Sequence, residues 1–285
     1  MSAFAPKRIL APIDLSAGSA KIVEWAGLFA RAFGSSLEVF HADWVDAPPY
    51  FTAGQVAELA AQRAAHRHAL EQMLTDLVSP ILGPEIRWST RISEGRPITE
   101  IEKRIDEAPP DLMALGSHGR SGAARVLLGS VAENVIRHST SPLLIVPARF
   151  PKDRRPAVRS ILCPVNFTDS ARRCVEASAE LASQFDATLQ VIHSAEDRST
   201  DLDEVRQRLC VWLPSSVRSR CSVTEIVREG DAAEQIIKAA KVHDSDLIAL
   251  TAEHRPFLEW STIGTTTVRV MRHSEIPVLM LPVKA

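Results

Sequence analysis

The chain has 285 residues, of which 45% are hydrophobic and 24% charged, and these proportions exclude a disordered protein. Because 33 basic residues are balanced by 35 acidic residues, the net charge of −2 gives no overall electrostatic reason to bind nucleic acid or an anionic membrane. At roughly 150 residues per domain, the length corresponds to one large domain or two.

Short apolar runs alternate with helical patterns along the first half of the chain. The expected strands are residues 8–13, 37–42, 86–93, 112–115 and 143–146. The first strand is followed by a helix that Ser16 or Ser19 caps and that has Gly34 as its C′ residue. Further helices are expected at residues 52–78, 98–108 and 130–138.

The long helical pattern at residues 52–78 has an apolar side. The residues expected on this side are Val56, Leu59, Leu70, Met73 and Leu77.

Strict alternation of strands and helices predicts an α/β fold, with a parallel sheet and helices on both faces. Ligands of such sheets lie beyond the carboxyl ends of the strands, where the strand order reverses. The first positions to consider as binding residues are therefore Asp14, Ala42 and Gly116, which follow or end three of the strands.

The second half of the chain repeats the first. Residues 9–16 match residues 161–168 at an offset of 152 positions, and residues 111–115 match residues 246–250 at an offset of 135. One length change, a shorter helix near residues 200–213, accounts for the difference. We therefore expect two tandem domains, residues 1–149 and 150–285, joined by a charged segment with two prolines.

A glycine-rich stretch between the expected strand 112–115 and the helix at Ser130 is the most informative motif. Gly116 and Gly119 let the backbone approach a ligand and adopt positive φ. Gly129 and Ser130 present free N–H groups at a helix N-terminus, where the helix dipole favours an anion, and Arg120 adds a positive charge.

Each of these features also has an explanation without a ligand. Ser130 and Glu133 form the capping-box pattern S-x-x-E, and glycines between a strand and a helix make a tight turn. The motif is neither a P-loop nor a G-x-G-x-x-G dinucleotide fingerprint. The residues alone therefore leave phosphate binding and a purely structural turn open.

With these motifs the sequence resembles the universal stress protein family, over the whole chain and as two tandem copies. Gly116, Gly119, Gly129 and Ser130 reproduce the family's G-x2-G-x9-G-[ST] spacing, and residues 9–16 are similar to its first strand. The resemblance implies two five-stranded, Rossmann-like domains of the adenine nucleotide alpha hydrolase type. It also implies binding of ATP, which one class of the family binds.

The resemblance assigns roles to residues of the first half. Asp14 would face the ribose or a Mg²⁺ ion, or else cap the helix that follows it, and Ala42 would meet adenine through its backbone. The remaining implied site residues are Pro12 beside the nucleotide, Leu115 and Gly116 beside the ribose, and Gly119, Arg120, Gly129, Ser130 and Val131 around the phosphates.

The second half departs from this pattern. Asn166 replaces the Asp14 carboxylate, and Thr251 and His254 replace the first two glycines. Glu253 and Glu259 add negative charge where phosphate would lie. We expect ATP in the first half only.

The other candidate groups are less informative. His66 and His68, two positions apart on a helix, are expected to be solvent-exposed rather than metal ligands. His41 and His193 at equivalent strand ends are expected to pack. For His118, within the glycine loop, phosphate contact and loop stabilisation are equally open. Cys163, like the other three cysteines, belongs to no C-x-x-C pair and is expected to be a small buried hydrophobe.

These observations predict an ATP-binding stress-response regulator with at most slow ATP hydrolysis and no catalytic residues. The alternatives are a non-catalytic interaction module, a binder of another ligand in the second half, and an ATP-dependent transferase. Pairing of the last strands, 143–147 and 278–283, would make the chain an intrachain pseudo-dimer, with a homodimer also open. Asp14 interrupts the first apolar stretch and no run reaches roughly 18 apolar residues, so we expect a cytoplasmic protein without membrane or nucleic-acid partners.

Overall fold

The structure is a computed structural model that describes residues 4–44, 53–118, 128–151, 153–195, 201–252 and 264–282, without the side chains of residues 53–61 and 252. Within these ranges the strands form one ten-stranded sheet in the order β3-β2-β1-β4-β5-β10-β9-β6-β7-β8. The strands of the first half are β1 (Arg8–Pro12), β2 (Ser36–Asp43), β3 (Trp88–Glu94), β4 (Leu112–Gly116) and β5 (Leu143–Val146). Those of the second half are β6 (Ser160–Pro164), β7 (Thr188–Ala195), β8 (Val223–Glu229), β9 (Leu247–Ala252) and β10 (Val278–Pro282).

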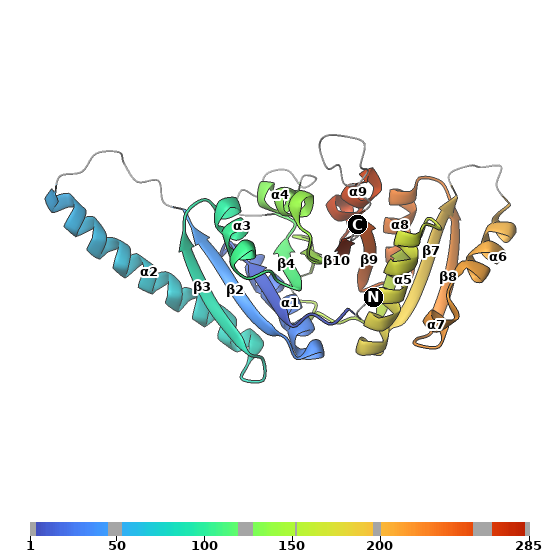
Figure 1. The fold of residues 1–285 in the computed structure, drawn as a ribbon, viewed down its shortest axis with the longest axis horizontal. Coiled ribbons are helices and arrows are strands. Elements are labelled where there is room, and N and C mark those ends of the chain that lie inside the picture. Colours follow the sequence, from blue (N-terminus) through green and yellow to red (C-terminus); the bar gives the residue numbers. More distant parts are fainter. Residues whose placement is uncertain are drawn as a thin grey trace.

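Helices follow the strands and cover both faces of the sheet (Figure 1). The helices of the first half are α1 (Ser19–Phe33), α2 (Ala53–Leu82), α3 (Pro97–Glu107) and α4 (Ser130–His138). Those of the second half are α5 (Asp169–Phe185), α6 (Leu202–Trp212), α7 (Ser215–Arg218), α8 (Ala232–Val242) and α9 (Thr265–His273).

Each face of the sheet has one hydrophobic core that runs through both halves. Side chains of α1, α2, α5, α6 and α7 form the first core, and those of α3, α4, α8 and α9 form the second. Along β5 the alternation is direct, since Leu144 and Val146 enter the first core while Leu143 and Ile145 enter the second. The expected α/β class with helices on both faces is confirmed.

The two halves are joined by strand pairing and by aromatic side chains. β5 and β10 pair antiparallel, as expected for the last strands, with Leu144 opposite Leu279, while the other strand pairings are parallel. Beside this junction, Phe29 of α1 lies 5.4 Å from Phe185 of α5, measured between ring centroids. Separating the halves would therefore expose apolar surface of each.

The helix expected at residues 52–78 is present as α2. Of the residues expected on its apolar side, Leu70 is buried and Leu77 is partly buried, while the side chains of Val56 and Leu59 lie outside the described part of the structure. Leu70, Leu74, Val78 and Leu82 are buried, whereas Met73, expected on this side, is 54% exposed. The buried residues recur every fourth position and form one row along the helix, and Met73 lies beside this row. The helix α1 ends as expected at Gly34, which adopts the left-handed conformation with φ 64°.

Candidate functional site

A pocket of about 270 Å³ lies at the carboxyl ends of β1 and β4. These two strands are the place where the strand order of the first half reverses. Their pairing is short, because the register joins only Ile9 with Leu112 and Leu10 with Met113. Pro12 has no N–H to donate to a ladder, so β1 and β4 are free to part beyond this point.

The carboxylate of Asp14 lines one side of the pocket. Its Oδ1 atom accepts hydrogen bonds from the backbone N–H of Ser16 at 3.0 Å and from the hydroxyl of Ser19 at 3.2 Å. The backbone next to it is held as well, since the N–H of Ile13 donates to Phe40 and Nδ1 of His41 lies 2.9 Å from the carbonyl oxygen of Ile13. Asp14 is thus oriented by its neighbours at the carboxyl end of β1.

The N-terminus of α4 also lines the pocket, with Gly129, Ser130 and Val131 among the lining residues. The N-cap is Gly129, which has no side chain, and no side-chain cap of this helix end is found among the described residues. The first N–H groups of an α-helix have no partner within the helix, and the helix dipole makes this end attractive to an anion. The pocket lining therefore combines a carboxylate with an anion-attracting helix end.

His118 lines the pocket just beyond the end of β4. Its Nδ1 atom lies 2.9 Å from the hydroxyl of Ser117, which also accepts a hydrogen bond from the N–H of Ala148. Burial, with a further contribution from the positive charge of Arg149, lowers the pKa of His118. The ring is accordingly biased toward its neutral form.

The pocket brings together eight of the residues singled out in the sequence: Pro12, Asp14, Ala42, Leu115, Gly116, Gly129, Ser130 and Val131. They belong to β1, β2, β4 and α4 or lie within two residues of these elements, so the fold gathers positions that are far apart in the chain. Gly119 and Arg120 lie outside the described residues, and so do His254, Glu253 and Glu259 of the second half.

Three local expectations at this site are wrong. The N–H of Gly129 is not free, because it donates to the carbonyl oxygen of Ser117 at 2.8 Å. Gly116 does not have positive φ, because it is the last residue of β4. A Cβ atom there would lie 3.0 Å from Cδ1 of Ile22 and 3.2 Å from the carbonyl oxygen of His118, so close packing rather than φ disfavours a side chain. The capping box is also absent, since Ser130 is the first helical residue instead of the N-cap and Glu133 pairs with Arg137 at 2.7 Å.

The apolar lining was not anticipated from the sequence. Besides the expected residues, the pocket is lined by Ile13, Ile22, Phe40, Pro97, Ile101 and Ala132. Their sequence signal is the ordinary apolar periodicity of strands and helices, which does not separate lining from core positions. Apolar walls with a few polar groups are typical of small-molecule sites.

The second half retains the frame of this site but changes its polar groups. His193 contacts the carbonyl oxygen of Val165 at 2.8 Å, as His41 contacts that of Ile13. Asn166 occupies the position of Asp14, and its Oδ1 accepts from the hydroxyl of Thr168 at 2.7 Å. Cys163 is fully buried, as expected. His66, expected to be exposed, is 52% exposed and contacts Asp43 at 3.1 Å.

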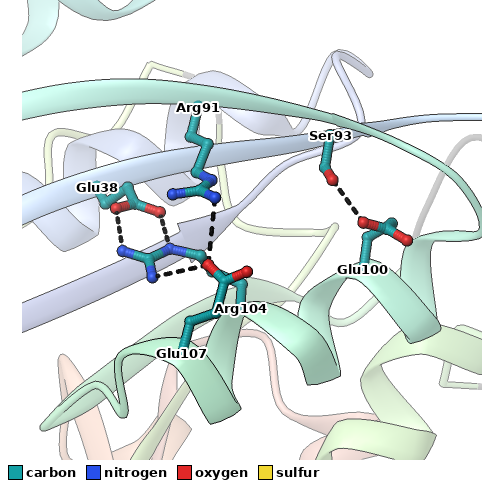
Figure 2. Close-up of polar contacts among 6 residues, drawn as sticks. All are labelled: Glu38, Arg91, Ser93, Glu100, Arg104 and Glu107. Atoms are coloured by element: carbon teal, nitrogen blue, oxygen red, sulfur yellow. Dashed lines mark hydrogen bonds and ion pairs between the residues drawn. The ribbon is translucent and has the colours of Figure 1, made fainter.

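An ionic network holds α3, which contributes to the pocket wall, against the sheet (Figure 2). Arg104 donates two hydrogen bonds to Glu38 on β2, at 2.6 and 2.7 Å, and this pairing raises the pKa of Arg104. At the start of the same helix, Glu100 accepts from Lys103 and Ser93, and these hydrogen bonds lower the pKa of Glu100. The network stabilises the side of the sheet that carries the site.

A model of the universal stress protein family matches residues 6–147 and 216–282. A universal stress protein of Methanocaldococcus jannaschii is 30% identical over 144 residues, which are 49% of this chain and 81% of that protein. One of Mycobacterium tuberculosis is 24% identical over 196 residues, 62% of this chain and 66% of that protein. The chain belongs to the universal stress protein family, with tandem domains.

The fold as a whole is shared with a solved relative. A crystal structure of a universal stress protein from Archaeoglobus fulgidus superposes with a TM-score of 0.71 at 20% identity, over 97% of this chain and 98% of that one. In the described part of the present chain no helix is long and apolar enough to cross a membrane. The same residues contain no cluster of three or more histidine, cysteine, aspartate or glutamate side chains that would hold a metal ion.

Proposed function

We propose that this protein is a nucleotide-dependent regulator that binds ATP in the pocket of its first half. The observation that carries the proposal is the N-terminus of α4, with a glycine as its N-cap and no side-chain cap among the described residues, in the lining of an apolar pocket at the strand-order reversal. Such a pocket offers apolar contact for a base and N–H groups for phosphates. Family membership supports the same assignment.

Gly129 is compatible with close approach of a nucleotide to the start of α4. Gly129 has φ −63° and ψ 149°, a conformation that other residues adopt, so its backbone does not require glycine. Ser, Thr, Asp or Asn would cap the helix better than glycine does. A glycine here leaves the helix end open to a ligand, as the proposal requires.

We further propose that Mg²⁺ binds together with ATP. Mg²⁺ is usually held by one or two carboxylates and by substrate phosphates instead of a complete protein cage. Asp14 fits this pattern, since it is the carboxylate that lines the pocket and two hydrogen bonds orient it. The nucleotide phosphates would supply the other ligands, and slow hydrolysis remains the most that we assign to the site.

We propose that the two halves, residues 1–149 and 150–285, have different functions. Asn166 gives the second half a neutral amide where the first half has the Asp14 carboxylate. We propose that the second half does not bind ATP and instead completes an intrachain pseudo-dimer through the β5–β10 pairing. Further association of two chains, and a cytoplasmic location, remain part of the proposal.

Mass spectrometry of gently purified and then denatured protein tests the proposal. Co-purified ATP at up to one molecule per chain is the expected result. A Gly129→Val variant, which fills the open end of α4, should lose it. The matched control is Gly264→Val, because Gly264 is the equivalent N-cap of α9, with φ −51° and ψ 137°. Equal nucleotide content in both variants would contradict the assignment.

A further inference from the structure

We propose that His118 binds a phosphate oxygen of the ligand through its Nε2–H group. This inference rests on the proposed nucleotide site and adds a specific binding residue to it. His118 is a lining residue of the pocket. The N–H of Gly129 donates to the carbonyl oxygen of Ser117 at 2.8 Å, so the segment that carries His118 lies against the start of α4. His118 is therefore at the end of the pocket where phosphates are expected.

The hydrogen bonds of Ser117 determine which ring nitrogen carries the proton. The Ser117 side chain is buried, and its Oγ accepts from the N–H of Ala148 at 3.1 Å. A hydroxyl has one hydrogen to donate. Among the described residues, the acceptor in reach of this hydrogen is Nδ1 of His118, at 2.9 Å. The hydroxyl oxygen could accept a second hydrogen bond, but the buried hydroxyl hydrogen has a partner among the described residues only when Nδ1 is the acceptor. We therefore place the hydrogen of the neutral ring on Nε2.

The Nε2 atom is buried and has no hydrogen-bond partner among the described residues. A buried N–H group without an acceptor is costly, and an oxygen atom of a ligand would satisfy it. Burial and Arg149 lower the pKa of His118. In the ligand-free protein the neutral ring is therefore favoured near pH 7, and its Nε2–H is available to donate to a ligand oxygen.

The second half lacks both members of this arrangement. In the repeat, Ala252 takes the position of Ser117, and Glu253 takes that of His118. An alanine has no hydroxyl to orient a neighbour, and an ionised glutamate accepts hydrogen bonds but donates none. The pair is therefore specific to the half that we assign to ATP.

Two measurements on the full-length protein test this role. ¹⁵N NMR of the ligand-free protein should show Nδ1 of His118 unprotonated and Nε2 protonated near neutral pH, whereas the opposite tautomer would overturn the inference. Calorimetric titrations with ATP, inorganic tripolyphosphate and adenosine then test the contact. His118→Ala should weaken ATP and tripolyphosphate binding by about 10- to 100-fold, the usual effect of losing a hydrogen bond to a charged group.

The variants separate a phosphate contact from a structural role. His118→Gln retains an N–H donor at a similar reach and should bind close to wild type, and the exposed His138→Ala is the matched control. Adenosine binding should not respond to His118→Ala, and an equal loss for adenosine would contradict a phosphate contact. Wild-type ATP affinity in His118→Ala overturns this inference and leaves the proposed function intact. Failure of the wild type to bind ATP or tripolyphosphate overturns both.

Discussion

The hydroxyl of Ser19 donates a hydrogen bond of 3.2 Å to Oδ1 of Asp14. Ser19 is buried at the start of α1, so the helix that follows β1 directly orients the carboxylate of the pocket. In the second half both partners are replaced, Ser19 by Ala171 and Asp14 by Asn166. The two halves therefore differ both in the carboxylate and in the group that orients it.

Replacing Asp14 with asparagine should remove the Mg²⁺ dependence of ATP binding. An asparagine oxygen still accepts the hydrogen bonds of Oδ1, so the fold is retained, but the negative charge that attracts Mg²⁺ is lost. We expect about tenfold weaker binding of Mg²⁺–ATP, equivalent to about 1.4 kcal/mol, and a smaller change for ATP in EDTA. Calorimetric titration of the variant, with Asn166→Asp as control, measures this. An unchanged Mg²⁺ dependence in Asp14→Asn would refute the role.

The ion pair between Arg104 and Glu38 should show strong coupling in a double-mutant cycle. Their side chains are 16% and 20% exposed, so Arg104→Ala leaves a largely buried carboxylate without its partner. With partial solvent screening, we expect a loss of about 2 kcal/mol in the free energy of unfolding. The double variant Glu38→Gln/Arg104→Ala, which carries the residue types of Gln190 and Ala239 in the second half, should lose less than Arg104→Ala alone. Additive losses in urea unfolding would exclude the coupling.

Protonation of His118 should destabilise the ligand-free protein. Its pKa is lowered in the folded state from an ordinary value of 6.5, so the unfolded state binds more protons as the pH falls below that value. Stability is therefore full above about pH 6.5 and declines as the pH falls toward the lower folded-state pKa. Urea unfolding between pH 5 and 8 in a phosphate-free buffer measures the decline. His118→Gln should show a smaller decline than wild type, and an equal decline would exclude His118 as its source.

The aromatic contact across the halves should make the chain unfold as one unit. Phe29 is fully buried in the core that both halves share, and its ring packs against that of Phe185. Phe29→Ala should lower the free energy of unfolding by about 3–5 kcal/mol. Differential scanning calorimetry should show a single transition that moves to lower temperature. Two transitions, of which only one moves, would mean that the halves unfold independently.

The bounds of helices and strands were predicted well where the residues that end one element and begin the next are close together in the sequence. The helix expected at residues 130–138 and the strand expected at 143–146 are present with those bounds, because Ser139 and Pro142 separate the amphipathic helix from the apolar strand. The alternation of strands and helices also indicated which strand ends to consider as binding positions. Periodicity was less informative for Met73. Apolar residues lie both on the buried row of α2 and on the row beside it, so the pattern did not show which row faces the core.

Features that depend on distant pairs were not predictable in this way. Glu38 and Arg104 are 66 positions apart and meet only because α3 packs on β2. The tautomer that we assign to His118 depends on Ser117, whose hydroxyl accepts a hydrogen bond from the backbone N–H of Ala148. Ala148 lies beyond β5, 31 positions from Ser117 in the chain. Likewise, the preference for glycine at position 116 arises from close contacts with the side chain of Ile22 on α1 and with the carbonyl oxygen of His118, not from a positive φ.

The stoichiometry of ATP binding to the full-length chain tests the central claim most directly. Calorimetric titration should give one ATP per chain for wild type and for Gly264→Val, and no detectable binding for Gly129→Val. Two sites per chain, or one site that survives Gly129→Val and is lost in Gly264→Val, would contradict the assignment of the nucleotide to the first half.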